Sequence, residues 1–199
     1  INEYIGSFEK LNKPVQIPID MGEERLLLPP NLNIREKITI KDLLTPILER
    51  GKANAILQNK IWNQSSQWPN WSTKEISSKF RVIAEIVANL LENACKYTEE
   101  NALIGIFLLN SGIIVFDNGK KISSEEGEKI FRKGYRGISS KNKDGTGVGL
   151  FLARKLAKKI EADLYLLENY HDNELSNEIQ NLKITNIFYL KLPIEQLHK

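Results

Sequence analysis

Apolar residues recur at helical spacing in three long stretches of the chain. The clearest is 79–97, where apolar residues repeat every three or four positions and form one face of a helix. That face consists of Ile83, Ile86, Val87, Leu90, Leu91 and Ala94. Residues 41–58 and 148–160 show the same period over shorter stripes. The pattern therefore predicts three amphipathic helices.

Short apolar runs between these helices predict β-strands. Residues 103–109 and 113–116 are joined by Asn110, Ser111 and Gly112, a combination typical of a hairpin. Further strands are expected at 36–40, at the start of 59–72, at 163–168 and at 184–192, with polar stretches at 117–146 and 169–183. Because helices and strands mix and the hairpins are long, the sequence predicts an α+β fold with helices layered on a mixed β-sheet.

The first 35 residues differ from the rest of the chain. Four of the seven prolines lie in the first thirty positions, and 13–35 has no clean period. We therefore predict an extended lead-in at 1–35 and one domain at 36–199. Ile1, Ile5 and Phe8 are spaced like the end of an amphipathic helix, and a frayed terminus is the alternative.

The composition excludes several kinds of protein. A length of 199 residues with 41% hydrophobic residues fits one globular domain with an extension. One cysteine and two histidines exclude an internal disulfide and finger-type zinc sites. A net charge of +3 does not indicate a nucleic-acid partner. The longest apolar run, 103–109, is shorter than the ~20 residues of a membrane helix.

No export signal is visible, so a cytoplasmic location is expected. Because the chain opens on Ile1 rather than Met, we expect it to be a piece of a longer protein. All three tryptophans lie in the loop after residue 59. These are Trp62, Trp68 and Trp71. We favour the interpretation that they cover the edge of the domain over the alternative that they form a partner-binding patch.

The polar face of the predicted helix 79–97 carries the first candidate site. Asn89 and Asn93 are four residues apart, so their amides lie on the same face. An amide oxygen suits Mg²⁺, which takes few protein ligands when it also binds phosphate. Lys96 lies one turn further along and can reach a phosphate. Taken alone, these three residues are more typical of a solvated face.

Two glycine-containing segments are the other candidates. Asp117-Asn118-Gly119 follows a buried strand, and its carboxylate can accept a hydrogen bond from an exocyclic amine such as that of adenine. A simple turn is the alternative. The run from Gly145 to Leu150 opens the helix 148–160, where glycines let the backbone approach phosphate oxygens. Its spacing fits neither a Walker loop nor a dinucleotide-binding fingerprint.

Together and in this order, the segments resemble the sensor histidine kinases. Residues 89–98 (NLLENACKYT) resemble the family's N box and 117–119 its G1 box. Residues 130–136 (IFRKGYR) resemble its F box and 144–150 (DGTGVGL) its G2 box. The resemblance covers about 36–193. It implies the Bergerat ATP-binding fold shared with gyrase and Hsp90, a two-layer sandwich with helices on one face of a mixed sheet and a flexible ATP lid.

The resemblance also implies roles for single residues at the phosphate end. Asn93 would bind Mg²⁺, with Asn89 assisting near the phosphates, and Lys96 would contact phosphate. Arg136 would be a lid residue that stabilises charge on the γ-phosphate during transfer. Asn89, Lys96 and Arg136 are thus the implied catalytic residues. Arg136 with Lys133, Lys141 and Lys143 fits a closing lid, and a solvated loop is the alternative.

Other residues would hold the nucleotide. The resemblance implies that Tyr97 lines the pocket, that Asp117 bonds the adenine amine and that Gly119 lets the ring sit close. The end of the lid would be shaped around the phosphates by Gly145, Thr146, Gly147, Val148, Gly149 and Leu150.

Three positions depart from related patterns. Lys121 stands where the G1 box usually has a second glycine, and a lysine there would tolerate a positive φ poorly. Gly134 replaces an aromatic of the F box, which would remove a contact that pins the lid. Asn89 stands where hydrolysing members carry a general-base Glu, and the offset of Glu92 on the helix points it elsewhere. We therefore expect slow hydrolysis of ATP.

The implied function is that of the catalytic domain of a two-component sensor histidine kinase. It would transfer the γ-phosphoryl of Mg·ATP to a histidine on its own upstream dimerisation helices, and from there to the receiver domain of a response regulator. The parent would be a homodimer and this fragment a candidate monomer, with 1–35 including the tail of an upstream helix. Neither His171 nor His198 lies in a helical phosphoacceptor pattern, so the acceptor is expected outside this chain.

Two alternatives remain open. An anti-sigma-factor-type serine kinase shares the fold and also lacks the base. A degenerate module would bind nucleotide or partners with little chemistry, and Lys121 and Gly134 are its best support.

Overall fold

The computed structural model describes residues 15–16, 27–28, 37–137, 145–167 and 182–198. The chain divides into two compact units, Ile1–Lys37 and Ile38–Lys199. In the first unit, β1 (Val15–Gln16) pairs antiparallel with β2 (Leu27–Leu28). The helix end predicted at 1–12 lies outside the described residues, as does most of the predicted lead-in. The division at 1–35 and 36–199 stays a prediction.

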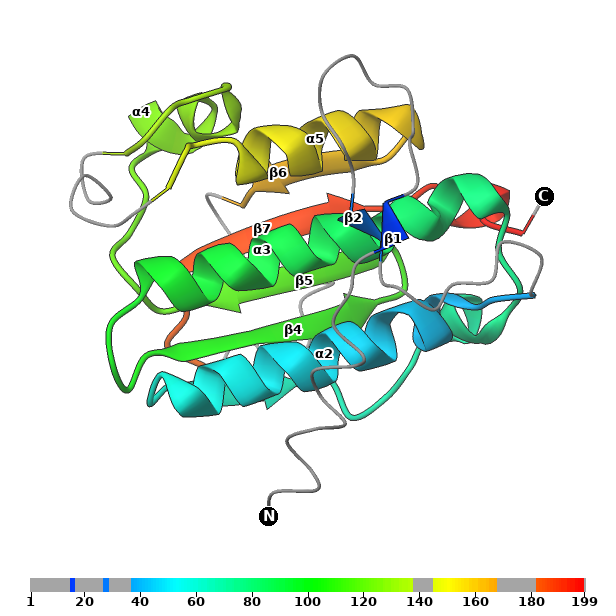
Figure 1. Cartoon of the computed structure of the whole chain (residues 1–199), viewed down its shortest axis with the longest axis horizontal. Helices are drawn as coiled ribbons and strands as arrows, with labels where there is room; N and C mark the ends of the chain where they lie inside the picture. The colour runs from blue at the N-terminus through cyan, green and yellow to red at the C-terminus, as the bar shows by residue number, and fades with distance from the viewer. Residues whose placement is uncertain (1–14, 17–26, 29–36, 138–144, 168–181, 199) are drawn as a thin grey trace. The chain divides into compact units, whose positions relative to one another are not determined.

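The second unit is built on a five-stranded mixed sheet in the order β3-β4-β5-β7-β6 (Figure 1). Its edge strand β3 (Ile61–Gln64) runs parallel to β4 (Leu103–Leu109). The other pairs are antiparallel and comprise β4 with β5 (Gly112–Asp117), β5 with β7 (Asn186–Lys191) and β7 with β6 (Asp163–Leu166). The register sets Asp117 opposite Asn186.

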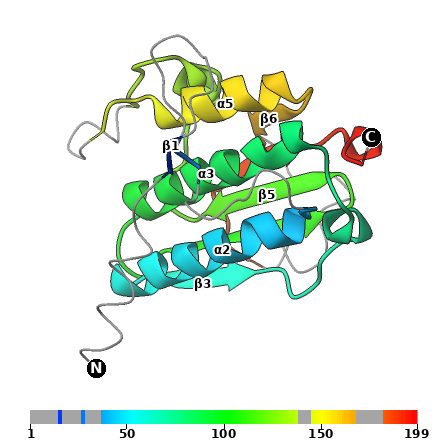
Figure 2. The same cartoon turned by 45° about the vertical axis from the view of Figure 1, so that its right-hand side comes forward.

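Three helices cover one face of this sheet, α2 (Ile40–Leu57), α3 (Ile83–Tyr97) and α5 (Gly149–Lys159) (Figures 1 and 2). The six apolar residues of the predicted stripe on α3 are all buried, at 3% exposure or less. The predicted α+β fold with a layer of helices is therefore confirmed.

The opposite face of the sheet is apolar as well. Phe107, Ile114, Phe116, Ile187 and Tyr189 form a buried cluster there, and the rings of Phe107 and Phe116 stack with centroids 5.0 Å apart. Because β4 and β5 bury side chains on both faces, they appear in the sequence as continuous apolar runs rather than as alternating strands.

The strand expected at 36–40 is wrong. Thr39 forms one isolated bridge to Glu75 and then caps α2. Its hydroxyl accepts from the Asp42 backbone N–H at 3.1 Å, and its own N–H donates to the Asp42 carboxylate at 3.0 Å. This capping box satisfies two orphan donors and begins the helix at Ile40.

The helix expected at 79–97 begins later than predicted. A 3₁₀ turn occupies Ser78–Val82, and the α-helix starts at Ile83. The polar stretch after β5 contains two further short helices, α4 (Ser124–Gly127) and a 3₁₀ turn at Lys129–Phe131. These lie beside the N-terminal end of α5.

The tryptophans in and after β3 pack against the domain. Trp71 is 6% exposed and donates from its indole nitrogen to the Leu109 carbonyl at 3.0 Å. Trp62 lies against Gly51 of α2, where a Cβ would come within 3.1 Å of its ring. Lys41 lies 5.8 Å from the ring centroid of Trp68. These contacts favour edge cover over a partner patch.

Candidate nucleotide-binding site

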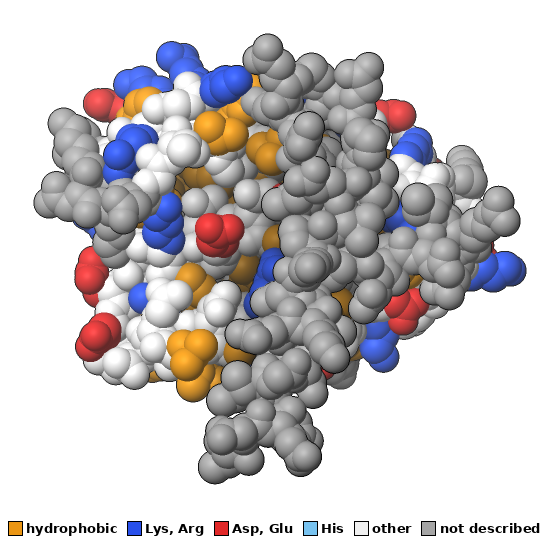
Figure 3. All heavy atoms as spheres, viewed as in Figure 1, with side chains coloured by type: hydrophobic (Ala, Val, Ile, Leu, Met, Phe, Trp, Pro, Cys, Tyr) orange, Lys and Arg blue, Asp and Glu red, His pale blue; other side chains and the backbone are white. Residues whose placement is uncertain are grey.

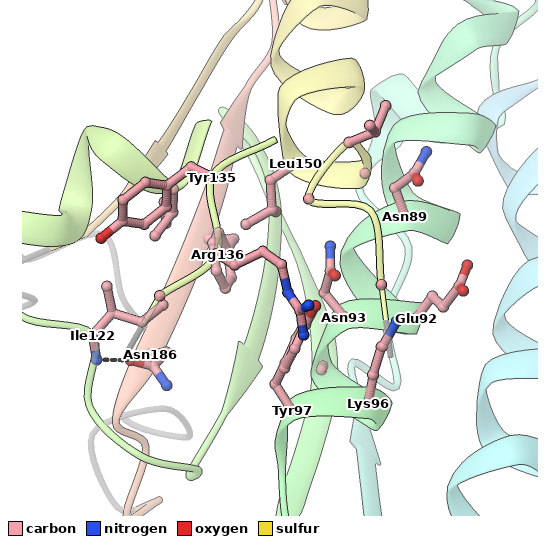
Figure 4. A pocket seen from close by; sticks show the side chains of 18 of the residues that line it. Asn89, Glu92, Asn93, Lys96, Tyr97, Ile122, Tyr135, Arg136, Leu150 and Asn186 are labelled. Atoms are coloured by element: carbon pink, nitrogen blue, oxygen red, sulfur yellow. Dashed lines mark hydrogen bonds between the residues drawn. The ribbon is translucent and has the colours of Figure 1, made fainter. Parts of the chain in front are cut away.

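A pocket of about 400 Å³ lies between α3, the end of β5, the segment around Tyr135 and the start of α5 (Figure 4). Segments far apart in the sequence meet here. The predicted site residues that line it are Asn89, Asn93, Lys96, Tyr97, Asp117, Arg136, Gly145, Thr146, Gly147, Val148, Gly149 and Leu150. Gly119 is not among the lining residues. The predicted lid residues Lys141 and Lys143 lie outside the described part of the chain.

The amides of α3 face the first turn of α5. A Cβ on Gly149 would lie 3.3 Å from Asn89 Oδ1 and 3.6 Å from Asn93 Nδ2. Asn89 Nδ2 donates to the backbone carbonyl of Glu85 at 2.9 Å and to its carboxylate at 3.2 Å. The absence of a side chain on Gly149 therefore leaves Asn89 Oδ1 and the Asn93 amide open to a ligand between the helices.

Asp117 lies at the opposite end of the pocket and is 6% exposed. Its Oδ1 accepts from the Gly119 N–H at 2.9 Å and from Asn186 Nδ2 at 2.8 Å. Burial raises the pKa of this carboxyl, and the two hydrogen bonds oppose that rise. Within the described residues, Oδ2 makes no hydrogen bond, which leaves an acceptor for a ligand amine.

Asn186 is a site residue that the sequence analysis missed. Its Nδ2 also donates to the Lys120 carbonyl at 3.0 Å, and its Oδ1 accepts from the Ile122 N–H at 2.9 Å. With three bonds to other segments, the amide is held in one orientation. A lone Asn at the start of a strand carries no signal in the sequence, and only its register with Asp117 reveals it.

Gly119 contributes to this end of the pocket indirectly. A Cβ there would lie 2.9 Å from Thr98 Cγ2 and 3.0 Å from the Asp117 carboxylate. The residue thus lets the backbone fold tightly enough to donate to Asp117. Its implied direct contact with a ring stays a prediction.

The two sides of the glycine-rich turn are tied together. The Gly134 N–H donates to the Gly147 carbonyl at 3.0 Å. Both residues have positive φ, +74° and +69°, a conformation that favours glycine. A Cβ on Gly145 would come within 2.7 Å of Lys96 Nζ and 3.2 Å of Tyr97 Oη, so the N box and G2 box are in direct contact.

This geometry bears on both of the positions that depart from the boxes, Lys121 and Gly134. Positive φ at described non-glycine residues occurs at Asn59, Asn101 and Glu161, so Lys121 carries no such strain. Gly134 does not leave the turn unpinned, because its backbone bonds Gly147 and the next residue supplies an aromatic. Tyr135 lines the pocket and donates its hydroxyl to Glu126 at 3.1 Å.

The F box region is also fixed to α5. Arg154 donates to both carboxylate oxygens of Glu128, at 2.6 and 3.1 Å. The same guanidinium lies 4.5 Å from the ring centroid of Phe131. The hydrogen bonding from Arg154 is the main reason that the pKa of Glu128 is lowered. The bidentate geometry ties the F box region to α5, whose first turn lines the pocket.

The charges around the pocket suit an elongated anion with an amine at one end. Lys96, Lys120 and Arg136 line it, against Glu92 and Asp117. Glu92 is thus a lining residue, and in Figure 4 its carboxylate turns away from Asn93. Lys and Arg side chains also gather at the upper left of the domain, in the region of α4 (Figure 3). Polyanion binding and an amine acceptor are therefore available in one cavity.

The donor set bears on which metal could bind. No group of three or more His, Cys, Asp or Glu side chains that could hold a metal occurs within the described residues. The two amides of α3 fit Mg²⁺, which uses few protein ligands when phosphate supplies others. His198 is engaged with the Glu75 carbonyl at 2.8 Å, and His171 lies outside the described ranges.

Comparison with known proteins identifies the family. Residues 79–196 match the family model of the histidine kinase-, DNA gyrase B- and HSP90-like ATPases. The chain belongs to this family. The resemblance noted in the sequence is thereby confirmed, and the pocket lies among the elements that the family model covers.

Similar proteins include sensor kinases. The sensor histidine kinase Hik2 of Thermosynechococcus vestitus is 30% identical over 140 residues, which are 67% of this chain and 35% of that protein. The swarming motility regulation sensor protein RssA of Serratia marcescens is 34% identical over 102 residues, 49% of this chain and 22% of that protein. The chain thus spans about a third or less of these two relatives.

Solved structures that superpose on this chain include histidine kinases. The mycobacterial sensor histidine kinase MprB superposes with a TM-score of 0.56 at 18% identity, covering 79% of this chain and 97% of that chain. Full-length ShkA, solved in complex with AMPPNP, gives a TM-score of 0.54 at 19% identity, covering 79% of this chain and 30% of that chain. No described helix of this protein is long and apolar enough to cross a membrane.

Proposed function

We propose that this chain is the ATP-binding catalytic domain of a sensor histidine kinase. One observation carries the proposal: the amides of α3, the glycine turn of α5 and the buried carboxylate of β5 converge on one pocket of about 400 Å³. Its sensor-kinase relatives favour this activity over an anti-sigma-type serine kinase or a degenerate module. The related ShkA was solved with AMPPNP, an ATP analogue.

Within the pocket, the nucleotide would lie along α3. Asp117 would accept from the adenine amine through Oδ2, because Oδ1 is already engaged by Gly119 and Asn186. The phosphates would lie toward the start of α5, where unpaired backbone N–H groups of the first turn and Lys96 favour negative charge.

Mg²⁺ would be held by Asn93 with Asn89 assisting, and it would neutralise phosphate charge when bound. Arg136 lines the same pocket and would stabilise charge on the γ-phosphate. Asn89 has no general-base capacity, so ATP would be kept for transfer rather than hydrolysed quickly. The protein supplies mainly positioning and charge neutralisation.

The acceptor would be a histidine on upstream dimerisation helices of the parent protein, followed by the receiver domain of a response regulator. A homodimeric parent would bring the two parts together. We place the domain in the cytoplasm because the ATP it would use is found there.

The test is equilibrium titration of the purified chain with a fluorescent, non-hydrolysable ATP analogue, with Mg²⁺ and with EDTA. We expect saturable binding that Mg²⁺ strengthens, and at least a tenfold loss in Asn93→Ala, about 1.4 kcal/mol. Asn54→Ala is the matched control, since Asn54 is an exposed helical asparagine on α2. No binding by the wild-type chain, or equal binding by both variants, would contradict the proposal.

A second experiment separates the two kinases. The parent protein is incubated with γ-labelled Mg·ATP, and the labelled product is exposed to acid and to alkali. A phosphohistidine is lost in acid and survives alkali, whereas a phosphoserine behaves in the opposite way. Acid-stable label would favour the serine-kinase alternative.

A further inference from the structure

Glu85 lies one turn before Asn89 on α3, and among the described residues it alone bonds the Asn89 side-chain amide. Asn89 Nδ2 donates to the Glu85 backbone carbonyl at 2.9 Å and to its Oε1 at 3.2 Å. Both hydrogens of Asn89 Nδ2 are therefore engaged by acceptors of Glu85. The amide oxygen is left facing the pocket.

The side-chain oxygen of Asn89 faces the start of α5 (Figure 4). Asn89 Oδ1 lies 3.3 Å from the position that a Cβ would take on Gly149, and Figure 4 places Asn89 beside the glycine turn. A backbone carbonyl alone could hold one amide hydrogen. The side chain of Glu85 adds a second acceptor and makes the flipped amide, with oxygen facing oxygen, costly.

The surroundings of Glu85 suit this role. The carboxyl is partly buried, and burial raises its pKa, whereas the hydrogen bond from Asn89 and the charge of Arg50 on α2 lower it. The like charge of Glu92 adds to the rise in the pKa of Glu85. A carboxylate between a cation and an amide draws electron density toward the amide oxygen, which makes that oxygen a stronger acceptor for a cation.

We propose that Glu85 is a positioning residue that orients and polarises Asn89 toward the metal–phosphate end of the nucleotide. The inference rests on the proposed function, since it assigns Glu85 to the same site. It extends the N box by one helical turn beyond the residues that touch the ligand.

The first test is independent of nucleotide. Side-chain amide resonances of Asn89 are compared by ¹⁵N-correlated NMR in the wild type, Glu85→Met and Glu85→Gln, with Asn89→Ala for assignment. We expect the Asn89 signal to shift strongly in Glu85→Met and to stay near its wild-type position in Glu85→Gln, because glutamine keeps an acceptor oxygen. An unmoved signal in Glu85→Met would overturn the proposal.

The second test measures binding of the same ATP analogue with Mg²⁺ and with EDTA. We expect Glu85→Met to lose about tenfold in affinity with Mg²⁺ and little in EDTA, with partial recovery in Glu85→Gln. Glu49→Met is the matched control, because Glu49 is an exposed glutamate on α2. A merely structural role would weaken binding equally in both buffers.

The outcomes separate the inference from the function beneath it. A wild-type chain without nucleotide binding refutes the proposed function. Normal wild-type binding with an equal loss in both buffers for Glu85→Met, or with no loss, refutes only the role of Glu85.

Discussion

Replacing Asn186 by Asp sets a second carboxyl group against Asp117 at the buried end of the pocket. In the wild type, Nδ2 of Asn186 donates to Asp117 Oδ1 at 2.8 Å. The change substitutes an oxygen for that donor and keeps the size and shape of the side chain. It therefore tests the hydrogen bond and the charge without creating a cavity.

The magnitude follows from the distance. Two charges 2.8 Å apart repel by about 6 kcal/mol at an effective dielectric constant of about 20. This repulsion exceeds the free-energy cost of protonating one of the two carboxyls near neutral pH. The pair should therefore keep one proton at pH values well above the usual carboxyl pKa. A protonated carboxyl can donate to Asp117 and so imitate the asparagine.

The sign of the pH effect is thereby set. Below the upper pKa of the pair, the variant should bind the ATP analogue much like the wild type. As pH rises through that pKa, the donor is lost and repulsion appears, so both affinity and the free energy of unfolding should fall. If half of the repulsion, about 3 kcal/mol, acts against binding, the affinity for the ATP analogue falls about a hundredfold.

The assay is analogue titration together with chemical unfolding, between about pH 6 and pH 9. Asn186→Ala is the control, because it loses the donor without adding a charge and should bind weakly at every pH. A variant Asn186→Asp whose affinity stays level across this range would refute the contact between Asn186 and Asp117.

Three further predictions concern separate parts of the domain. Asp117→Asn should lose about a hundredfold in ATP-analogue affinity. In the wild type, the raised pKa of Asp117 makes the free energy of unfolding fall as pH rises through that pKa. Chemical unfolding of the wild type should therefore show a pH slope that the variant lacks. Gly149→Ala should keep or slightly raise the free energy of unfolding, since alanine favours helix, yet weaken binding in titrations because its methyl would press on Asn89. Lys60→Met should cost about 1–3 kcal/mol in chemical unfolding, because the buried ammonium donates to the carbonyls of Thr98 and Glu99 at the end of α3; an unchanged midpoint would contradict that role.

Much of the fold was accessible from local patterns. The stripe on α3 predicted both the helix and its buried face, because a period of 3.6 residues is written in consecutive positions. The strand 103–109 was predicted with its exact bounds, since a continuous apolar run of that length is typical of a strand buried on both faces. The error at 36–40 came from reading Ile38 and Ile40 as strand while the capping pair Thr39 and Asp42 signalled a helix start.

The candidate site divides in the same way. Its glycine turn and its paired amides are local and were found, because their spacing alone restricts what the backbone can do. The backbone conformations at Lys121 and Gly134 were not accessible from the sequence, since a backbone φ and a bond to Gly147 depend on how distant segments meet.

By itself, the sequence determined the three long helices, the strands of the five-stranded sheet and the residue types that could meet a nucleotide. The tertiary structure alone decided which of them act together. Asn186 reaches Asp117 across 69 positions because β5 and β7 pair in one register, and a shift of one residue would turn its side chain to the other face. Periodicity is a property of neighbours along the chain, whereas the orientation of a buried carboxylate is set by neighbours in space.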